Sequence, residues 1–528
     1  MSDATHARSV TGDTLIDSSP SQSPSASTFV DAPKATTERI VPPEHPYRTL
    51  VLCFDGTGDQ FDADPGITQN SNIVEFFTLL KKDDRSKQMV YYQAGIGTYT
   101  TPQVATPLMA KISKALDEAI AWNLDAHVMG GYEFLMQNYT AGDRICIFGF
   151  SRGSYTARSL AGMIHKVGIL PACNHQQVPF AYKMYTRADE IGWEQSNAFK
   201  KAFSIDADIE FIGVWDTVNS VGLIPKRLPF TTSNTNVRTF RHAVALDERR
   251  AKFKANLWNR PSQKEAELGL DGKPKDRRHH CDEPSLMNMI ADAAGKQSDH
   301  SKHAHTLRAL ERKYSKDRNS PTDIEEVWFA GCHCDVGGGS VSNDTKPNLA
   351  RIPLRWMIRE CFRTNTGIMF HADLLEDVMG VDSSALYPTV LPRPPPLKIT
   401  QEHYIRCPTS KATTSVTTSS SSQVIKRPTE EELELADALS PIYDQLSLKW
   451  FWWILEFWPV RMRYQQGDGS WKSFLGWNLG RGRIIPKQKT RGVKVHRSVK
   501  MRLEAQHEDG GRYVPKAKFD EQYVTWVD

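Results

Sequence analysis

The chain has 528 residues, of which 39% are hydrophobic and 24% are charged, as in globular proteins that bury a sizeable core. The 66 basic and 62 acidic residues leave a formal net charge of only +4, so no charge signature of nucleic-acid binding is present. No apolar run approaches the length of a membrane-spanning helix, and the sequence therefore predicts no transmembrane segment.

The first 45 residues are rich in Ser, Thr, Pro and Asp, and they contain too few apolar residues to form a core. We expect this stretch to be a disordered tail. It also lacks the apolar segment of a secretory signal peptide. Eight cysteines are sparse for a chain of this length, which favours reduced cysteines and a cytoplasmic location.

Candidate strands alternate with candidate helices from residue 50 onward. Residues 50–54 form a continuous apolar run that stops at an Asp-Gly pair, as a buried strand does where it meets a loop. Similar strand patterns lie in residues 89–99, 142–150, 208–218 and 325–339, and helical spacing lies in residues 112–139 and 154–168. This alternation predicts an α/β fold with a mostly parallel sheet and helices on both faces.

Three segments interrupt or follow this pattern. Residues 260–320 are highly charged and are expected to be an insertion in a main α/β domain of residues 46–400. Residues 408–430 are a low-complexity linker or loop. Residues 431–528 form an aromatic and basic segment that we expect to pack on or cap the main domain. Its stretch from Trp450 to Trp458 suits either a packed helix or a peripheral membrane contact, and its aromatic residues on all sides favour packing.

A G-x-S-x-G pentapeptide occurs at residues 149–153, between a candidate strand and a candidate helix. This context is that of a nucleophile elbow, in which Ser151 would sit on a sharp, strained turn at the start of the helix. The N–H group of Arg152 would then be one donor of an oxyanion hole. The alternative is that Ser151 only caps the helix.

Five separated motifs occur within residues 48–370: "LVLCFDGTGD", "YYQAGIGTY", "GDRICIFGFSRGSYTARSLAGMI", "FIGVWDTVNSVG" with "RHAVALDERRAKF", and "VWFAGCHCDVGGG". Together they resemble the motifs of an α/β-hydrolase family that includes type VI secretion phospholipase effectors. The resemblance implies an α/β-hydrolase fold and serine esterase, lipase or phospholipase chemistry. We therefore expect an ester substrate, with a lipid or phospholipid ester as the candidate, and a Ser-His-Asp triad that forms an acyl-enzyme.

A serine nucleophile requires a base and an orienting acid, which follow it along the chain of an α/β-hydrolase in the order acid, then histidine. Asp216 and His333 both follow apolar strand patterns, and we predict that they are the acid and the base. Asp335 and Asp247 remain alternative acids, although Asp247 lies in a charged stretch expected to be helical. His496 remains the alternative base.

The loop after the first strand invites a second interpretation. Phosphatases of the haloacid-dehalogenase type use an aspartate nucleophile two positions before a D-G-T sequence, but Cys53 occupies that position before Asp55 here. We rank a phosphatase below a serine hydrolase. In the hydrolase interpretation, the N–H group of Gly56 or Thr57 would be the second oxyanion donor.

The remaining motifs give no signal for a cofactor. The sequences "HHCDE" and "CHCD" lack the paired spacing of a structural zinc site, and the glycine-rich stretches lack the pattern of nucleotide-binding loops. We predict no metal and no nucleotide. A third possibility is a non-catalytic interaction module that keeps the hydrolase fold.

Overall fold

The computed structural model describes the chain in segments separated by gaps. The described residues are 38–56, 69–95, 109–218, 228–231, 237–258, 311, 321–408, 427–450, 452–457, 459–465, 471–486 and 488–528. The predicted tail up to residue 37, nearly all of the charged insertion, residues 409–426 of the low-complexity linker, and Thr57 lie outside them.

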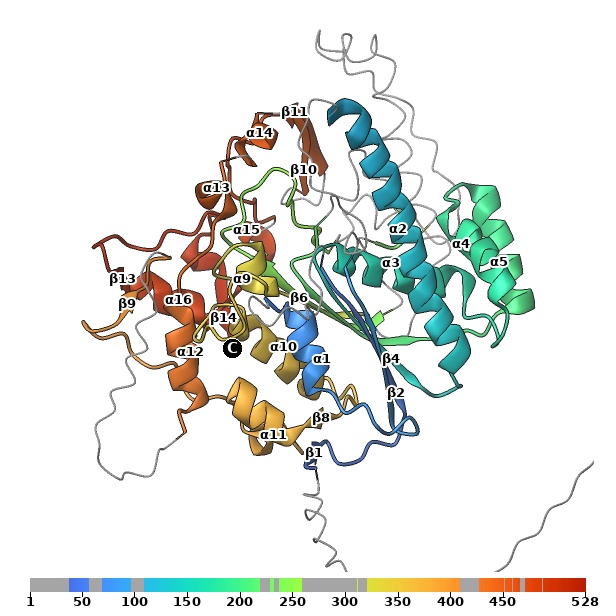
Figure 1. Ribbon diagram of the computed structural model, residues 1–528, viewed down its shortest axis with the longest axis horizontal. Coiled ribbons are helices and arrows are strands. Elements are labelled where there is room, and N and C mark those ends of the chain that lie inside the picture. Colours follow the sequence, from blue (N-terminus) through green and yellow to red (C-terminus); the bar gives the residue numbers. More distant parts are fainter. Residues whose placement is uncertain are drawn as a thin grey trace, which may run out of the picture. The chain divides into compact units, whose positions relative to one another are not determined.

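One eight-stranded sheet organises the described residues, and every pair of neighbouring strands in it is parallel. Its order across the sheet is β14-β12-β7-β6-β5-β4-β2-β3 (Figure 1). The strands are β2 (Thr49–Phe54), β3 (Gln88–Gln93), β4 (Arg144–Phe150), β5 (Ile209–Trp215), β6 (Val237–Ala245), β7 (Asp323–Phe329), β12 (Val493–His496) and β14 (Val524–Val527). The predicted α/β class with a mostly parallel sheet is confirmed.

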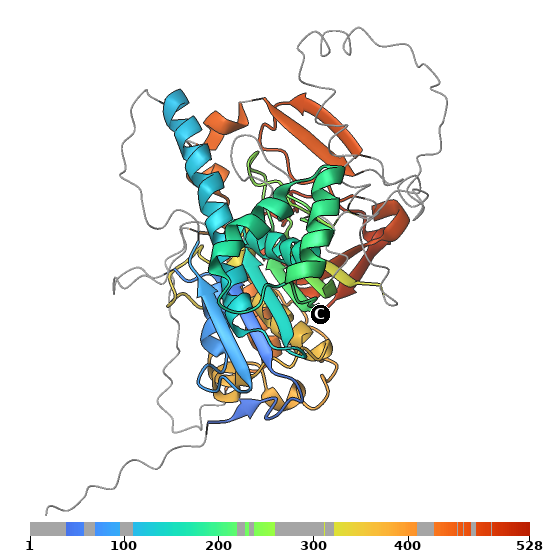
Figure 2. The same cartoon turned by 90° about the vertical axis from the view of Figure 1, so that its right-hand side faces the viewer.

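Helices cover both faces of this sheet (Figure 2). The alternation of side chains along β2 shows the two faces, because Leu50 and Leu52 belong to one hydrophobic core while Val51 and Cys53 belong to the other. The first core includes α2 (Met109–Asn138), α3 (Arg152–Val167), α4 (Val178–Thr186) and α5 (Glu190–Phe203). The second includes α1 (Asn72–Leu79), α10 (Arg351–Arg363), α12 (Glu430–Ala438) and α16 (Arg497–Glu504).

The polypeptide beyond residue 430 takes part in the main sheet. It supplies β12 and β14, which extend the sheet beyond β7. It also supplies α13 (Gln445–Leu448), α14 (Trp452–Glu456), α15 (Gln488–Arg491) and the hairpin of β10 (Val460–Gln465) and β11 (Trp471–Gly476). The segment thus contributes strands to the core as well as packing against it.

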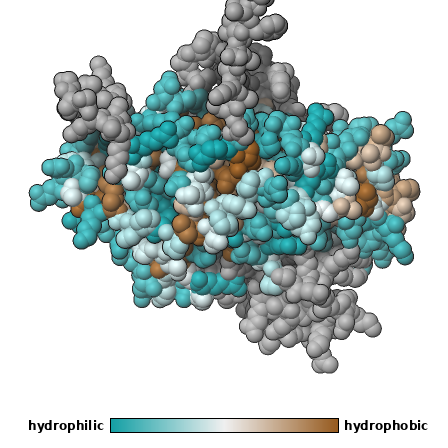
Figure 3. Space-filling view, turned by 90° about the horizontal axis from the view of Figure 1, so that it is seen from below, coloured by the Kyte–Doolittle hydropathy of each residue, from teal (hydrophilic) through white to brown (hydrophobic). Residues whose placement is uncertain are grey.

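Short pairs of strands complete the architecture. β1 (Ile40–Val41) pairs with β8 (Phe370–His371), and β9 (Tyr404–Ile405) pairs with β13 (Gln506–His507). The face of the molecule in Figure 3 is mainly hydrophilic, and its apolar side chains form small separate areas. Among the described helices, none is both long and apolar enough to cross a membrane.

Candidate active site

Four neighbouring strands of the sheet end close to polar residues. Because parallel strands end at the same edge, the residues after β4, β5, β6 and β7 are brought together there. Ser151 follows β4, Asp216 follows β5, and His333 begins the short helix α9 (His333–Gly337) after β7. The N–H group of Ser151 donates a hydrogen bond of 3.1 Å to the carbonyl of Trp215, so the serine lies beside the start of the Asp216 loop.

Ser151 has a strained backbone. Its φ of 58° and ψ of −119° lie outside the regions that non-glycine residues ordinarily adopt. Ser151 occupies the position before α3, but its side chain makes no capping hydrogen bond with the helix. The capping alternative is therefore not what the structure shows.

The two glycines of the pentapeptide allow this turn to pack closely. A Cβ atom added at Gly149 would lie 2.6 Å from the Cα atom of Ser154. A Cβ atom added at Gly153 would lie 2.3 Å from the carbonyl oxygen of Phe54 and 2.4 Å from that of Asp55. Side chains at either position would collide with backbone, so the start of α3 is pressed against the end of β2.

His333 and Asp216 form a buried hydrogen-bonded pair. The distance from Nδ1 of His333 to Oδ2 of Asp216 is 2.6 Å, and because a carboxylate only accepts, the imidazole donates from Nδ1. This leaves Nε2 as the ring nitrogen that can accept a proton. The ring lies between those of Phe150 and Phe253, with centroids 4.7 and 4.9 Å away. Burial lowers the pKa of His333 below its usual value, although Asp216 opposes this shift.

Asp216 is fully buried and is held from several sides. Its Oδ1 atom accepts a hydrogen bond of 2.9 Å from the N–H group of Ala245. The guanidinium group of Arg483 forms two further bonds, 2.5 Å to Oδ1 and 2.8 Å to Oδ2. Burial disfavours the charged carboxylate, but Arg483 and then His333 outweigh it, so the pKa of Asp216 is lowered. Like Ser151, Asp216 has a positive φ, here 41°.

No sequence pattern points to Arg483 or to a second ion pair that lies beside His333. Glu248 and Arg250 form two hydrogen bonds of 3.0 and 2.8 Å, and Glu248 also accepts the backbone N–H of His333 at 3.3 Å. The Arg250 guanidinium lies 3.5 Å over the ring of Phe253, which itself contacts His333. Glu248 and Arg250 follow β6, but many other loop residues also follow strands, so this position does not distinguish them.

The two alternative acids, Asp335 and Asp247, accept hydrogen bonds from backbone N–H groups of neighbouring loops. Asp335 accepts the N–H groups of Cys332 at 2.9 Å and Tyr443 at 3.0 Å, and burial raises its pKa to about 6. Asp247 is buried in a turn after β6 and not in a charged helix, which corrects that expectation. It accepts hydrogen bonds from the Tyr513 hydroxyl at 2.7 Å and the Gly331 N–H at 2.7 Å.

The alternative base, His496, lies in a different group of side chains. It precedes α16 and caps it, because its Nδ1 atom accepts the N–H of Ser498 at 3.2 Å. Its ring stacks on Phe329 with centroids 4.9 Å apart, and its Nε2 atom lies 3.7 Å from Glu434. Burial lowers its pKa to about 3. These contacts are those of a histidine that stabilises a helix end.

The loop after β2 carries a buried carboxylate that organises it. Asp55 accepts hydrogen bonds from the Gly56 N–H at 2.7 Å, the Ser71 hydroxyl at 2.6 Å and the Tyr92 hydroxyl at 2.8 Å. Burial raises the pKa of Asp55 to about 6. The N–H group of Gly56 is thus already engaged, and the Thr57 alternative lies outside the described residues.

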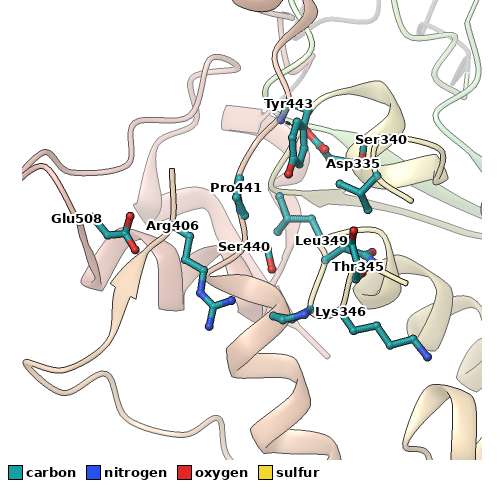
Figure 4. A pocket seen from close by; sticks show the side chains of 13 residues that line it. Asp335, Ser340, Thr345, Lys346, Leu349, Arg406, Ser440, Pro441, Tyr443 and Glu508 are labelled. Carbon is teal, nitrogen blue, oxygen red and sulfur yellow. Dashed lines mark hydrogen bonds between the residues drawn. The ribbon is translucent and has the colours of Figure 1, made fainter. Parts of the chain in front are cut away.

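A cavity of about 230 Å³ is lined by Asp335 of α9 and by residues that follow it along the chain (Figure 4). Its lining includes Asp335, Arg406, Tyr443 and Glu508, but neither Ser151 nor the His333–Asp216 pair. It is therefore separate from the candidate active site. Within the described part of the chain, no group of three or more His, Cys, Asp or Glu side chains could hold a metal ion. The "HHCDE" sequence lies outside that part.

Comparison with known proteins points to one family. A model described as "T6SS, Phospholipase effector Tle1-like, catalytic domain" matches residues 48–360, more than half of the chain. The uncharacterized protein YEL023C of Saccharomyces cerevisiae is 28% identical over 86% of this chain and 79% of its own length.

Two solved structures are distantly similar. An uncharacterized protein from Pseudomonas aeruginosa is 16% identical, with a TM-score of 0.29, over 61% of this chain and 46% of its own. The Tle1 effector bound to the VgrG spike of the type VI secretion system is 15% identical, with a TM-score of 0.27, over 60% of this chain and 57% of its own. This chain thus spans about half of the length of these two proteins.

Proposed function

The chain belongs to the family of Tle1-like phospholipase effector catalytic domains, and from this membership we propose that it is a serine hydrolase that cleaves carboxylic esters of lipids, including phospholipids. The five sequence motifs predicted this family, and the prediction is confirmed. Membership supports a hydrolase that acts on lipid esters. The residues and the mechanism below are our proposal.

The observation that carries the proposal is the hydrogen-bonded pair of His333 and Asp216, in which Asp216 follows β5, the strand next to the one that precedes the strained Ser151. Ser151 attacks the ester carbonyl while Nε2 of His333 accepts its proton. Asp216 keeps the imidazole in the tautomer with its proton on Nδ1 and stabilises the imidazolium. His333 then donates the proton to the leaving alcohol, and water releases the acyl group by the reverse sequence.

An oxyanion hole completes this mechanism. Arg152 is the first residue of α3 and directly follows Ser151. Its N–H group is the first donor, because the residue after the nucleophile supplies a donor in elbows of this kind. The second donor is an N–H group of the Asp-Gly-Thr loop, whose carbonyls contact the start of α3. Because Asp55 already accepts from Gly56, the Thr57 amide is the better candidate.

A fluorophosphonate probe tests the nucleophile. We expect labelling of the wild-type protein and of Ser154→Ala, whose buried hydroxyl bonds to the Trp215 carbonyl at 3.0 Å, but none of Ser151→Ala. Failure of the folded wild type to label would favour a non-catalytic module. Phosphate release that requires Mg²⁺ and persists in Ser151→Ala would favour the phosphatase alternative on Asp55.

We also propose that the surface beside this site contacts an anionic lipid bilayer. The polypeptide from residue 445 to 486 exposes large apolar side chains, namely Leu448, Trp450, Ile454, Phe457, Phe474, Leu475, Trp477, Leu479 and Ile484. We call these residues the apolar surface. Trp450 is 77% exposed and Leu475 is 71% exposed. Phe451 and Trp458 of the predicted contact lie outside the described residues.

Charge and connectivity favour a bilayer as the partner of the apolar surface. Lys449, Lys472 and Arg481 are exposed, while Glu456, the one acid among the described residues of this stretch, is buried. Cations around exposed tryptophan suit the interface of an anionic membrane. The stretch also adjoins the site, since Trp452 contacts Phe253, 5.7 Å between ring centroids.

Vesicle binding tests the apolar surface. We expect the triple variant Trp450→Ser, Phe457→Ser and Leu475→Ser to bind phosphatidylglycerol vesicles at least about tenfold more weakly, because three large apolar contacts are removed. Hydrolysis of a dissolved short-chain ester should not change. The matched control replaces Phe180, Ile191 and Phe203, which are 47%, 56% and 58% exposed on α4 and α5. Equal binding by both triple variants would contradict the proposal.

A further inference from the structure

The second charged partner of Asp216, besides His333, is a buried arginine from a distant part of the chain. The side chain of Arg483 is 3% exposed, and 267 residues separate it from Asp216. Besides its two bonds to the carboxylate, its guanidinium donates to the carbonyls of Ala245 at 3.1 Å and Phe253 at 2.7 Å. Every edge of the planar group is thus bound, which fixes its position.

This arginine leaves the carboxylate a single orientation. Oδ1 of Asp216 accepts from Ala245 and Arg483, and Oδ2 accepts from Arg483 and His333. A rotation of the carboxylate would break bonds on both oxygens at once. Arg483 also lies outside residues 48–360, so the part of the chain that matches the family model does not contain it.

We propose that Arg483 is a positioning residue of this site, which fixes the plane of the Asp216 carboxylate, neutralises its charge, and through it sets the orientation and basicity of His333. The inference rests on the proposed hydrolase function for its consequence in catalysis. The arrangement of Arg483, Asp216 and His333 itself does not depend on that function.

The expected signature is a pH dependence. The base must be neutral, so activity falls as the pH drops through the pKa of His333. Removing the cation leaves the Asp216 charge less compensated, which stabilises the imidazolium and moves this limb to higher pH. The titratable groups that face His333 are Asp216, Glu248 and Arg250, and those that face Asp216 are Arg483, His333 and His242.

Three variants of Arg483, one control variant and three measurements test this role. Arg483→Met and Arg483→Gln remove the charge, whereas Arg483→Lys keeps the charge but loses the two-pronged hydrogen bonding of the guanidinium group. Arg393→Met is the matched control, because the Arg393 side chain is also buried, at 4% exposed, and pairs with Glu434 at 2.9 Å, away from this site. The pH profile of kcat/KM is measured on a short-chain ester. The His333 imidazole is titrated by NMR in the same proteins, with unfolding temperatures recorded for each.

We expect the acid limb and the His333 titration to rise by about one pH unit in the Met and Gln variants, with kcat/KM at least about tenfold lower. Arg483→Lys should lose rate without this shift, and Arg393→Met should show neither. A loss of rate or stability in the neutral variants with an unmoved titration would overturn the proposal. If the His333 titration moves in these variants but the wild type has no esterase activity, the proposed function alone would be overturned.

Discussion

Replacement of His333 by alanine should lower kcat/KM for a short-chain ester by about 10³-fold or more. The variant loses the proposed general base for Ser151 and the proposed acid for the leaving alcohol. His242, the second imidazole near Asp216, is not placed to replace it, because its Nε2 atom accepts the N–H group of Thr217 at 3.1 Å and its Nδ1 atom bonds to Glu326 at 3.0 Å. A loss of stability alone would lower the folded fraction of the protein, but we expect the fall in kcat/KM to be larger than the fall in that fraction.

His496→Ala is the control for this result. His496 caps α16 and stacks on Phe329, so its loss should destabilise the fold but leave kcat/KM of the folded fraction nearly unchanged. Both variants are compared by steady-state kinetics after correction for the folded fraction measured by circular dichroism. The reverse pattern, with His496→Ala inactive and His333→Ala active, would exchange the roles of the two histidines.

Replacement of Gly153 by alanine should destabilise the protein by about 3 kcal/mol and abolish labelling by a fluorophosphonate. The added methyl group would lie 2.3 Å from the Phe54 carbonyl oxygen, and neither backbone can yield without moving Ser151 or the Asp55 loop. Overpacking of this kind strains the turn that holds Ser151, so stability and labelling should fall together.

Denaturant unfolding and probe labelling check this prediction. The control is Gly511→Ala, where the nearest atom to an added Cβ would be 3.6 Å away, an ordinary contact. That variant should unfold and label like the wild type. A Gly153→Ala protein with wild-type stability and labelling would show that the turn has room for a methyl group. That result would contradict the proposed need for close packing of α3 on β2.

The sequence predicted the sheet and the three central site residues for the same reason. Apolar strand patterns end at Ser151 and Asp216 and shortly before His333, and parallel strands bring their ends together. A local pattern was therefore sufficient to predict positions that are close in space. That these three residues act as a catalytic triad stays a prediction.

Other features could not be predicted, because they depend on contacts between distant segments. Arg483 lies in a Gly-Arg-Gly-Arg stretch that reads as an exposed basic tail, yet its side chain is buried against Asp216. The short strands β12 and β14 have only four residues each, too few for a pattern to be distinctive. Asp247 was expected in a charged helix, and its burial follows from Tyr513 and Gly331.

The aromatic stretch from Trp450 to Trp458 contains both packed and exposed side chains. Trp452 and Trp453 are half-buried, while Trp450 is 77% exposed, so one stretch supplies both packing and surface. Composition alone does not separate these uses, because the same residue type suits both environments.

The long separation between Asp216 and Arg483 has a consequence for biosynthesis. A ribosome adds about 5–20 residues per second, so the 267 residues between them take tens of seconds to make. During that interval the emerging polypeptide already carries its serine and its carboxylate, but the arginine that holds the carboxylate has not yet been translated. The buried ion pair between Asp216 and Arg483 therefore forms late, after synthesis has passed the Arg483 codon.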